Sequence, residues 1–327
     1  MTDKILVTGA TGFVGGRLAE MLVESGRDVR LLVRQPQALR PSLQDCELSV
    51  GDLADPEALH QAVTGVSLIF HCAANVSTWD SRENYLAVNV DGLRHLLDQV
   101  VAVNPDLKRF VHFSTVDVYD YPASPCDESC QLTEARFGYG ESKRQAELLL
   151  MDYGKKYDLS YTILRPCNVI GPGSQFVERI GAELKAGLML RVDGGRANAG
   201  PVFVDNLARY AVWAAEEEHA KGEVFNVRDP YDITWAQFLA DLKSGINGRG
   251  LLIDLPYWLA NAVAVTLGGL YSMLRIRAEP LLHPLVVKMF GRTCGHSAAK
   301  LHALCPHADY IDYPTAMQRS CDWFNKK

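Results

Sequence analysis

The alternation of short apolar runs with amphipathic stretches over residues 4–165 constrains the fold of this chain most strongly. The apolar runs predict strands, at Lys4–Thr8, Val29–Val33, Glu47–Val50, Leu68–His71, Phe110–Ser114 and Tyr161–Leu164. The stretches between them have helical periodicity, most clearly at Gly12–Ser25, Pro56–Val63, Glu83–Val103 and Gly140–Tyr157. Strands separated by helices predict an α/β fold with a parallel, doubly wound sheet and right-handed crossovers. A ligand site is then expected beyond the carboxyl ends of the strands.

The pattern loosens after residue 165, where prolines and glycines punctuate shorter elements. These residues are Pro172, Gly173, Gly187, Gly194, Gly195 and Gly200. We therefore predict a dinucleotide-binding domain over residues 1–165, which includes the helix of Tyr139 and Lys143. Residues 166–327 are predicted to form mainly a smaller substrate-binding lobe, with some segments returning to the first domain. With 327 residues and 48% hydrophobic content, the chain can bury a large core.

Composition excludes several classes of protein. The net charge is −6 and no long basic run is present, which argues against a nucleic-acid partner. Met1–Lys4 lead directly into a strand, so no signal peptide is expected. The eight cysteines have unrelated spacings, which predicts reduced thiols in a cytoplasmic protein. Cysteines and histidines do gather near the C-terminus, at Cys294, His296, His302, Cys305 and His307. They lack the spacing of a zinc site, so no metal is expected.

A glycine-rich loop follows the first predicted strand. Gly9, Gly12 and Gly15 are spaced G-x-x-G-x-x-G, and three glycines alone also fit an ordinary turn. Here they lie between an apolar strand and an amphipathic helix. In that context, backbone N–H groups and the helix dipole can face a phosphate. The loop therefore predicts a dinucleotide site.

The end of the second strand favours NADP over NAD. NAD enzymes commonly place an acid there to bind the ribose hydroxyls, whereas a 2′-phosphate requires a cation. This chain has Arg34 at that position, with Arg30 and Arg40 nearby; a solvated arginine is the alternative. Asp52 follows the third strand, where it can meet the adenine. Asp52 could also cap a helix, but Asp55, just before a proline, fits that role better.

Taken together, these motifs resemble the extended short-chain dehydrogenase/reductases (the NAD-dependent epimerase/dehydratase superfamily). In character the chain is most similar to the 3β-hydroxysteroid dehydrogenase-like and dihydroflavonol reductase-like branch. The matching segments are residues 8–15, 51–53, 71–74, 89–92, 114–119, Tyr139 with Lys143, and 165–173, with a weaker match at 202–208. They stand in the family's order and cover roughly the first half of the chain.

The resemblance implies roles for four residues. Tyr139 is the expected general acid in carbonyl reduction, and Lys143, four residues later on the same helix face, the cation that favours its phenolate. Lys143 is also expected to bind the nicotinamide ribose. Thr115 takes the place of the family's usual serine and would hydrogen-bond the reacting oxygen, with Ser114 as fallback. Asn89 is expected to support the lysine through water. Each residue alone also fits a structural role, in packing, on a solvated face, in a strand or at a helix cap.

The expected cofactor contacts follow the same motifs. They comprise Gly9, Thr11, Gly12, Phe13, Val14, Gly15, Arg34, Asp52, Leu53, Cys72, Ala73, Ala74, Tyr139, Lys143, Pro166, Asn168 and Val169.

The sequence leaves two classes of enzyme open, and they differ in substrate. We expect an NADP(H)-dependent oxidoreductase that interconverts a ketone and a secondary alcohol on a hydrophobic or sterol-like molecule. The alternative is a nucleotide-sugar epimerase or dehydratase with NAD, which Asn168 favours. Ala199 disfavours it, because such enzymes tend to carry an arginine there for the diphosphate, although Arg191 or Arg196 could substitute. A third possibility is a non-catalytic NADP-sensing regulator, but such regulators generally lack the tyrosine and lysine. By analogy, Glu83–Val103 and Gly140–Tyr157 predict a homodimer.

Residues 255–274 form an uncharged stretch followed by Arg275 and Arg277. Twenty uncharged residues reach the length of a membrane span, but Pro256, Asn261 and a glycine pair make a poor one. Trp258 at one end is typical of a membrane interface. We expect a buried or pocket-lining helix first, contact with a bilayer surface second and a true span last.

Overall fold

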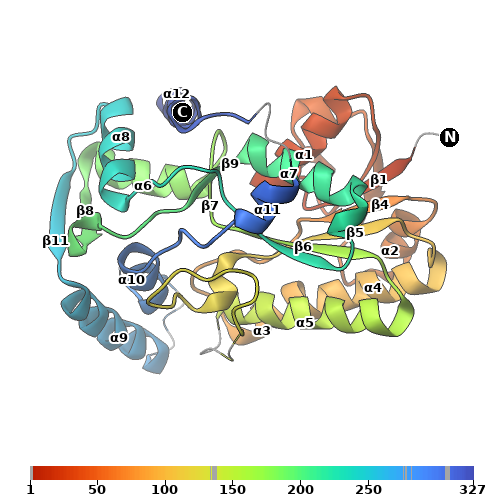
Figure 1. The fold of residues 1–327 in the computed structure, drawn as a ribbon, viewed down its shortest axis with the longest axis horizontal. Coiled ribbons are helices and arrows are strands. Elements are labelled where there is room, and N and C mark those ends of the chain that lie inside the picture. Colours follow the sequence, from red (N-terminus) through yellow and green to blue (C-terminus); the bar gives the residue numbers. More distant parts are fainter. Residues whose placement is uncertain are drawn as a thin grey trace.

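A seven-stranded parallel sheet forms the centre of the molecule (Figure 1). The computed structural model describes residues 3–132, 134, 138–274, 276, 278–280, 282–305 and 310–327. The strands of the sheet are β1 (Lys4–Thr8), β2 (Asp28–Val33), β3 (Glu47–Val50), β4 (Leu68–His71), β5 (Arg109–Phe113), β6 (Tyr161–Pro166) and β10 (Glu223–Val227). Their order is β10-β6-β5-β4-β1-β2-β3, and all neighbours are parallel. The predicted doubly wound α/β fold is confirmed.

Helices cover both faces of this sheet. They are α1 (Phe13–Glu24), α2 (Pro56–Val63), α3 (Arg82–Leu86), α4 (Gly92–Val103), α5 (Tyr139–Tyr157) and α7 (Val204–Glu216). Side chains alternate along a strand, so Ile5 and Val7 enter one core with α1 and α7, while Leu6 enters another with α2, α4 and α5. Figure 1 shows α1 and α7 on one side of the sheet and α4 and α5 on the other.

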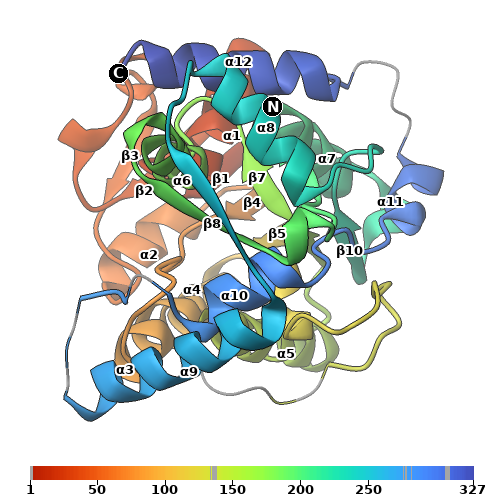
Figure 2. The same ribbon diagram turned by 90° about the vertical axis from the view of Figure 1, so that its left-hand side faces the viewer.

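The remaining elements build a second core beside the carboxyl ends of the strands. They are β7 (Asn168–Ile170), α6 (Gln175–Ala186), β8 (Leu188–Val192), β9 (Pro201–Phe203), α8 (Trp235–Gly245), β11 (Leu251–Leu255), α9 (Tyr257–Met273), α10 (Pro284–Gly291), α11 (Ala299–Leu304) and α12 (Tyr313–Asn325). β8 pairs with β11 and β7 with β9, and Figure 2 shows α9 and α10 side by side at the edge of the molecule. After residue 165 the chain also returns to the large sheet, through α7 and β10. The domain limits themselves stay a prediction.

The predicted elements of the first half lie where the sequence places them, within two residues at each end. Asp55 caps α2 as expected, since its carboxylate accepts from the N–H groups of Glu57 and Ala58 at 3.1 Å. The predicted helix Glu83–Val103 is interrupted, because Ala87–Asp91 form a π-helical turn between α3 and α4. Such turns are frequent at functional sites, and this one contains Asn89.

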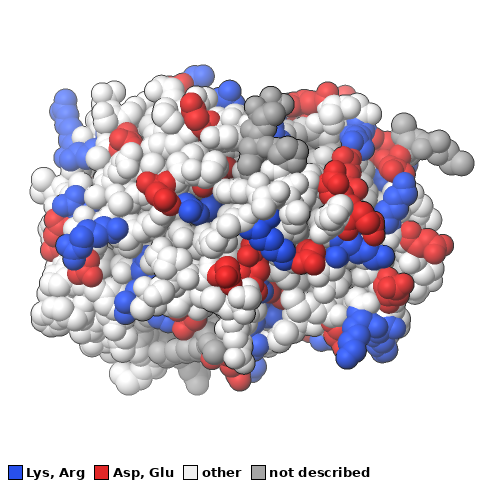
Figure 3. Space-filling model, in the orientation of Figure 1, with Lys and Arg blue, Asp and Glu red and all other residues white. Residues whose placement is uncertain are grey.

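Helix α9 corrects the first expectation for residues 255–274, because it is neither buried nor pocket-lining. Trp258 is 71% exposed and Met273 is 72% exposed, and the buried residues among those described in α9 are the small Ala260, Ala264 and Gly268. The surface at the lower left of Figure 3, over α9, is mostly free of charge. No helix among the described residues is long and apolar enough to cross a bilayer. Contact with a bilayer surface stays a prediction.

Three residues considered in the sequence, Arg275, Arg277 and His307, lie outside the described residues. All eight cysteines are free thiols. Within the described ranges, no group of three or more His, Cys, Asp or Glu side chains could hold a metal ion.

Candidate active site

A large cavity lies beyond the carboxyl ends of the strands, as the fold predicts. Its volume is about 1510 Å³, which exceeds the usual size of a small-molecule pocket and leaves room for a dinucleotide and a substrate together. One end is lined by the loops after β1, β2, β3 and β4, and the other by α6, β8 and α10. Residues that follow β5 and β6 line the middle.

The glycine loop forms a cradle that side chains would fill. Gly9 has a φ of +74°, and a Cβ there would lie 2.7 Å from the backbone nitrogen of Ala73. A Cβ on Gly15 would lie 2.5 Å from the Gly9 carbonyl oxygen. Gly12 caps α1 without a side-chain hydrogen bond, so the first N–H groups of this helix are open to a ligand. The loop therefore fits a dinucleotide pyrophosphate.

The predicted cofactor residues meet along this end of the cavity. With one exception, Lys143, every expected cofactor residue lines it. Asn168 is held in place by donating to the Ala199 carbonyl oxygen at 2.6 Å.

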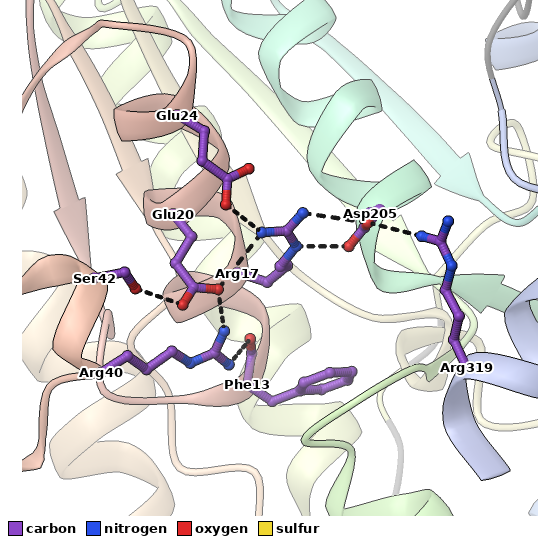
Figure 4. A network of polar contacts seen from close by, with 8 residues as sticks. All are labelled: Phe13, Arg17, Glu20, Glu24, Arg40, Ser42, Asp205 and Arg319. Atoms are coloured by element: carbon purple, nitrogen blue, oxygen red, sulfur yellow. Dashed lines mark hydrogen bonds and ion pairs between the residues drawn. The ribbon is translucent and has the colours of Figure 1, made fainter. Parts of the chain in front are cut away.

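Of the three arginines near the second strand, only Arg34 lines the cavity. Its side chain is 76% exposed and its guanidinium lies 3.6 Å from the Asp52 carboxylate. Arg30 instead binds Glu47 and backbone carbonyls at the C-terminal end of α2. Arg40 binds Glu20 at 2.5 Å, within the ion-pair network that joins α1 to α7 (Figure 4). Arg34 is thus the arginine of the three that is open to a phosphate.

Two of the four expected catalytic residues, Thr115 and Tyr139, line the middle of the cavity. Thr115 begins the turn Val116–Tyr119, and its hydroxyl accepts from the Asp117 N–H at 3.2 Å. The fallback, Ser114, donates its hydroxyl to the buried Glu147 carboxylate. Because that hydroxyl is already engaged, the geometry favours Thr115.

Tyr139 is the first residue of α5 and is half-buried. Burial, and then the nearby charge of Asp117, raise the pKa of this phenol above its ordinary value. The phenol is therefore protonated at neutral pH, which suits a general acid and requires a cation before the phenolate can form.

Lys143 does not contact Tyr139 in the way the sequence suggests. It is 1% exposed, and its ammonium lies 3.2 Å from Nε2 of the buried His112 on β5. Among the described residues, the cavity lining does not include it. A buried ammonium needs a hydrogen-bond acceptor, and Nε2 of His112 supplies it here. Burial lowers the pKa of Lys143 to about 8, against the opposing effect of Glu147.

Asn89 holds the loop after β4 in place through hydrogen bonds. Its Oδ1 accepts from the Asn75 N–H at 2.7 Å, while Nδ2 donates to the Asn75 carbonyl at 3.0 Å and to Ser142 Oγ at 2.8 Å. These bonds join the π-helical turn to α5 beside Lys143. Asn89 itself is outside the cavity lining.

The sequence analysis missed two further features of the site. Glu147 binds Arg165 through two hydrogen bonds of 2.9 and 2.6 Å, with side chains that are 0% and 3% exposed. Glu147 lies four residues after Lys143, a spacing that could have signalled it. Asp117 lies within the motif 114–119 and lines the cavity, but no role was predicted for it.

The other end of the cavity is predominantly apolar. Its apolar lining comprises Phe176, Ile180, Leu188, Met189, Leu190, Val192, Leu282, Val286, Val287, Met289 and Phe290. The charged residues there are Arg179, Glu183 and Glu279. Arg179 and Thr78 both donate to Oε1 of Glu279, at 2.7 and 2.6 Å. The positive charge of Arg179 is therefore compensated.

The pH dependence of reduction follows from Lys143. Its amine loses a proton near pH 8, and the charge that favours a phenolate at Tyr139 disappears above that pH. We expect kcat/KM for ketone reduction to fall as the pH rises through about 8. In Lys143→Arg, which keeps its charge, this decline should shift to higher pH. Initial rates across the pH range measure both. A profile that stays level to about pH 10 in the wild type contradicts the assignment of Lys143.

Comparison with known proteins agrees with the fold and identifies the family. The model of the NAD dependent epimerase/dehydratase family matches residues 5–227. The chain is 27% identical to an N-acetyl-alpha-D-glucosaminyl-diphospho-ditrans,octacis-undecaprenol 4-epimerase of Escherichia coli O157:H7, over 93% of this chain and 90% of that protein. It is 25% identical to the decarboxylating sterol-4-alpha-carboxylate 3-dehydrogenase of Mus musculus, over 98% and 91%. Other relatives are named as a ketoreductase, a 3-beta-hydroxysteroid dehydrogenase and a UDP-glucose 4-epimerase.

Among solved structures, the crystal structure of gox2253 has a TM-score of 0.82 and 25% identity, covering 100% of this chain and 98% of that one. The chain belongs to the NAD dependent epimerase/dehydratase family. It is an NAD(P)-dependent enzyme of the extended short-chain dehydrogenase/reductase type.

Proposed function

We propose that the protein is an NADP(H)-dependent oxidoreductase that interconverts a ketone and a secondary alcohol on a hydrophobic or sterol-like small molecule. The observation that carries this proposal is the apolar end of the cavity, which adjoins Thr115 and Tyr139. An apolar wall favours an apolar ligand, because burying both surfaces removes them from water. The similarity to a sterol dehydrogenase over nearly the whole chain supports the same class of substrate.

Each residue then has a task in reduction. NADPH, when bound, supplies the hydride. Tyr139 donates a proton to the carbonyl oxygen, and the Thr115 hydroxyl donates a hydrogen bond to the same oxygen. Lys143 stabilises the phenolate that remains on Tyr139, which requires its side chain to turn from His112 toward the start of α5.

The charges of the cavity disfavour the nucleotide-sugar alternative, although two relatives are named as epimerases of sugar substrates. A diphosphate needs uncompensated cations. Arg191 is paired with Asp254 at 2.6 Å, and neither Arg191 nor Arg196 is among the described residues of the lining. Arg179 does line the cavity but is bound to Glu279.

The non-catalytic regulator is the alternative from a different class. A regulator that only senses NADP has no need of an acid at the nicotinamide end. Tyr139 and Thr115 both face the cavity, which supports turnover.

The proposal is tested by following NADPH absorbance with a panel of steroid ketones, flavonoids, long-chain ketones and UDP-sugars. We expect NADPH consumption with one or more apolar ketones. Conversion of UDP-sugars without net NADPH consumption would establish the epimerase alternative instead. Binding of NADPH with no turnover of any compound would favour the regulator.

Arg34 decides the choice of cofactor. We expect Arg34→Ala to weaken NADPH binding about 10-fold and NADH binding less than about 2-fold, because a hydrogen-bonded charge pair with the 2′-phosphate is lost. Titration of protein fluorescence with each nucleotide measures both. Arg196→Ala, an exposed arginine outside the lining, is the control. Equal losses for the two nucleotides in Arg34→Ala would remove the phosphate role.

A further inference from the structure

The cavity contains a carboxylate that the reduction mechanism does not use. Asp117 lies in the turn Val116–Tyr119, two residues after Thr115, and lines the cavity with its side chain partly accessible. Burying a carboxylate costs free energy unless hydrogen bonds compensate it. Burial also raises the pKa of Asp117 above its ordinary value, against the lowering effect of the hydrogen bond from the Tyr121 hydroxyl. A role in the site would account for the free-energy cost of placing the Asp117 carboxylate here.

The local backbone holds this carboxylate in place. Tyr121 donates its hydroxyl to Oδ1 of Asp117 at 2.6 Å. To reach it, the chain turns through two successive left-handed residues, Asp120 with a φ of 51° and Tyr121 with a φ of 55°. Such conformations cost energy for residues other than glycine. The turn is thus built to support Asp117.

Asp117 also lies directly against the start of α5. A Cβ added to Gly140 would lie 2.4 Å from the Asp117 carbonyl oxygen and 3.2 Å from its Cβ. Gly140 follows Tyr139 in the chain, so Asp117 lies close to the proposed proton donor. Its charge affects the pKa of Tyr139 accordingly.

Among the described residues, the titratable neighbours of this acid include no cation. The titratable groups that influence or are influenced by Asp117 are Tyr121, Tyr139, Asp120, Cys167 and Cys294. Asp120 faces Lys288, with which it pairs at 2.6 Å. Among the described residues, Asp117 has no ion-pair partner. A carboxylate can accept about four hydrogen bonds, so part of its capacity remains open to a molecule in the cavity.

We propose that Asp117 accepts a hydrogen bond from a hydroxyl group of the substrate, on a carbon next to the one that is reduced. The inference rests on the proposed function and narrows it to apolar hydroxy-ketones and the corresponding diols. Only a hydrogen-bond donor satisfies a carboxylate, and the position of Asp117 beside Tyr139 places that donor close to the reacting carbonyl. A site that hydrogen-bonds a substrate hydroxyl discriminates against the analogue that lacks it.

A matched pair of ketones tests the inference with the NADPH-loaded enzyme. Cyclododecanone and α-hydroxycyclododecanone share an apolar ring and differ by one hydroxyl. We expect the hydroxy-ketone to be preferred about 10- to 100-fold in kcat/KM, the effect of one hydrogen bond to a charged group. In Asp117→Asn this preference should shrink to less than about 3-fold, because the charged acceptor is lost. The matched control Asp120→Asn removes an acid outside the cavity lining and should keep the wild-type ratio.

The outcomes separate the two claims. Equal kcat/KM for both ketones in the wild type overturns the inference but leaves the proposed function standing, even if Asp117→Asn fails to fold. A full preference that survives in folded Asp117→Asn overturns it as well. Turnover of neither ketone, together with conversion of UDP-sugars, contradicts the proposed function and this inference with it.

Discussion

Tyr139→Phe is expected to reduce kcat for ketone reduction by roughly 10²- to 10⁴-fold, the usual contribution of a positioned general acid. The substitution removes one hydroxyl and keeps the ring, so the walls of the cavity should be unchanged. NADPH affinity should remain within about 2-fold of the wild type, because the glycine loop and Arg34 lie at the other end of the site. Stopped-flow measurement of hydride transfer and fluorescence titration of NADPH together give both quantities.

Tyr157→Phe provides the matched control. Tyr157 is the last residue of the same helix, and it is 43% exposed. Loss of the Tyr157 hydroxyl should leave kcat unchanged. If Tyr139→Phe reduced ketones as fast as the wild type, the proton would have to come from another group and the proposed mechanism would be wrong.

Glu147→Ala is expected to lower the free energy of unfolding by about 3–5 kcal/mol, because the substitution leaves the Arg165 guanidinium buried without its counter-charge. Glu147 also accepts from Ser114, and Arg165 donates to the Tyr119 hydroxyl at 2.7 Å. The pair thus joins α5 to β6 and to the turn after β5, directly beside Thr115. Urea unfolding followed by circular dichroism measures the change.

Two further variants make this prediction specific. Asp254→Asn breaks the more exposed pair with Arg191 and should cost less than about 1 kcal/mol. The double replacement Glu147→Leu with Arg165→Met removes both charges and should recover most of the loss. A loss in Glu147→Ala no larger than in Asp254→Asn would show that the buried pair does not stabilise the fold.

The sequence was most informative where local signals agree with one another. The strands Lys4–Thr8, Glu47–Val50 and Leu68–His71 and the helix Pro56–Val63 have the predicted bounds. Each is a periodic apolar run closed by a turn or a cap, so short-range physics determines its ends. The glycine loop was equally clear, because its spacing and its position between a strand and a helix indicate the same use.

The features that sequence could not provide depend on packing between distant segments. The pairings of β7 with β9 and of β8 with β11 have no local signal, so the lobe could be foreseen only as a loosened pattern. His112 reads as a core residue of a strand, and nothing in its neighbourhood along the chain indicates that it binds Lys143. Helix α9 was expected to be buried because it is uncharged, yet its place at the edge of the lobe leaves much of it exposed.

Transfer of isotope from the cofactor tests the central claim most directly. NADPH carrying deuterium at both hydrogen positions of C4 of the nicotinamide is incubated with the enzyme and an apolar hydroxy-ketone, and the alcohol is analysed by mass spectrometry. The proposed reaction predicts one deuterium on the new carbinol carbon for each NADPH consumed. Formation of this deuterated alcohol should be lost in Tyr139→Phe. An alcohol without deuterium, or a deuterated cofactor that stays unconsumed while sugar nucleotides are epimerised, would contradict it.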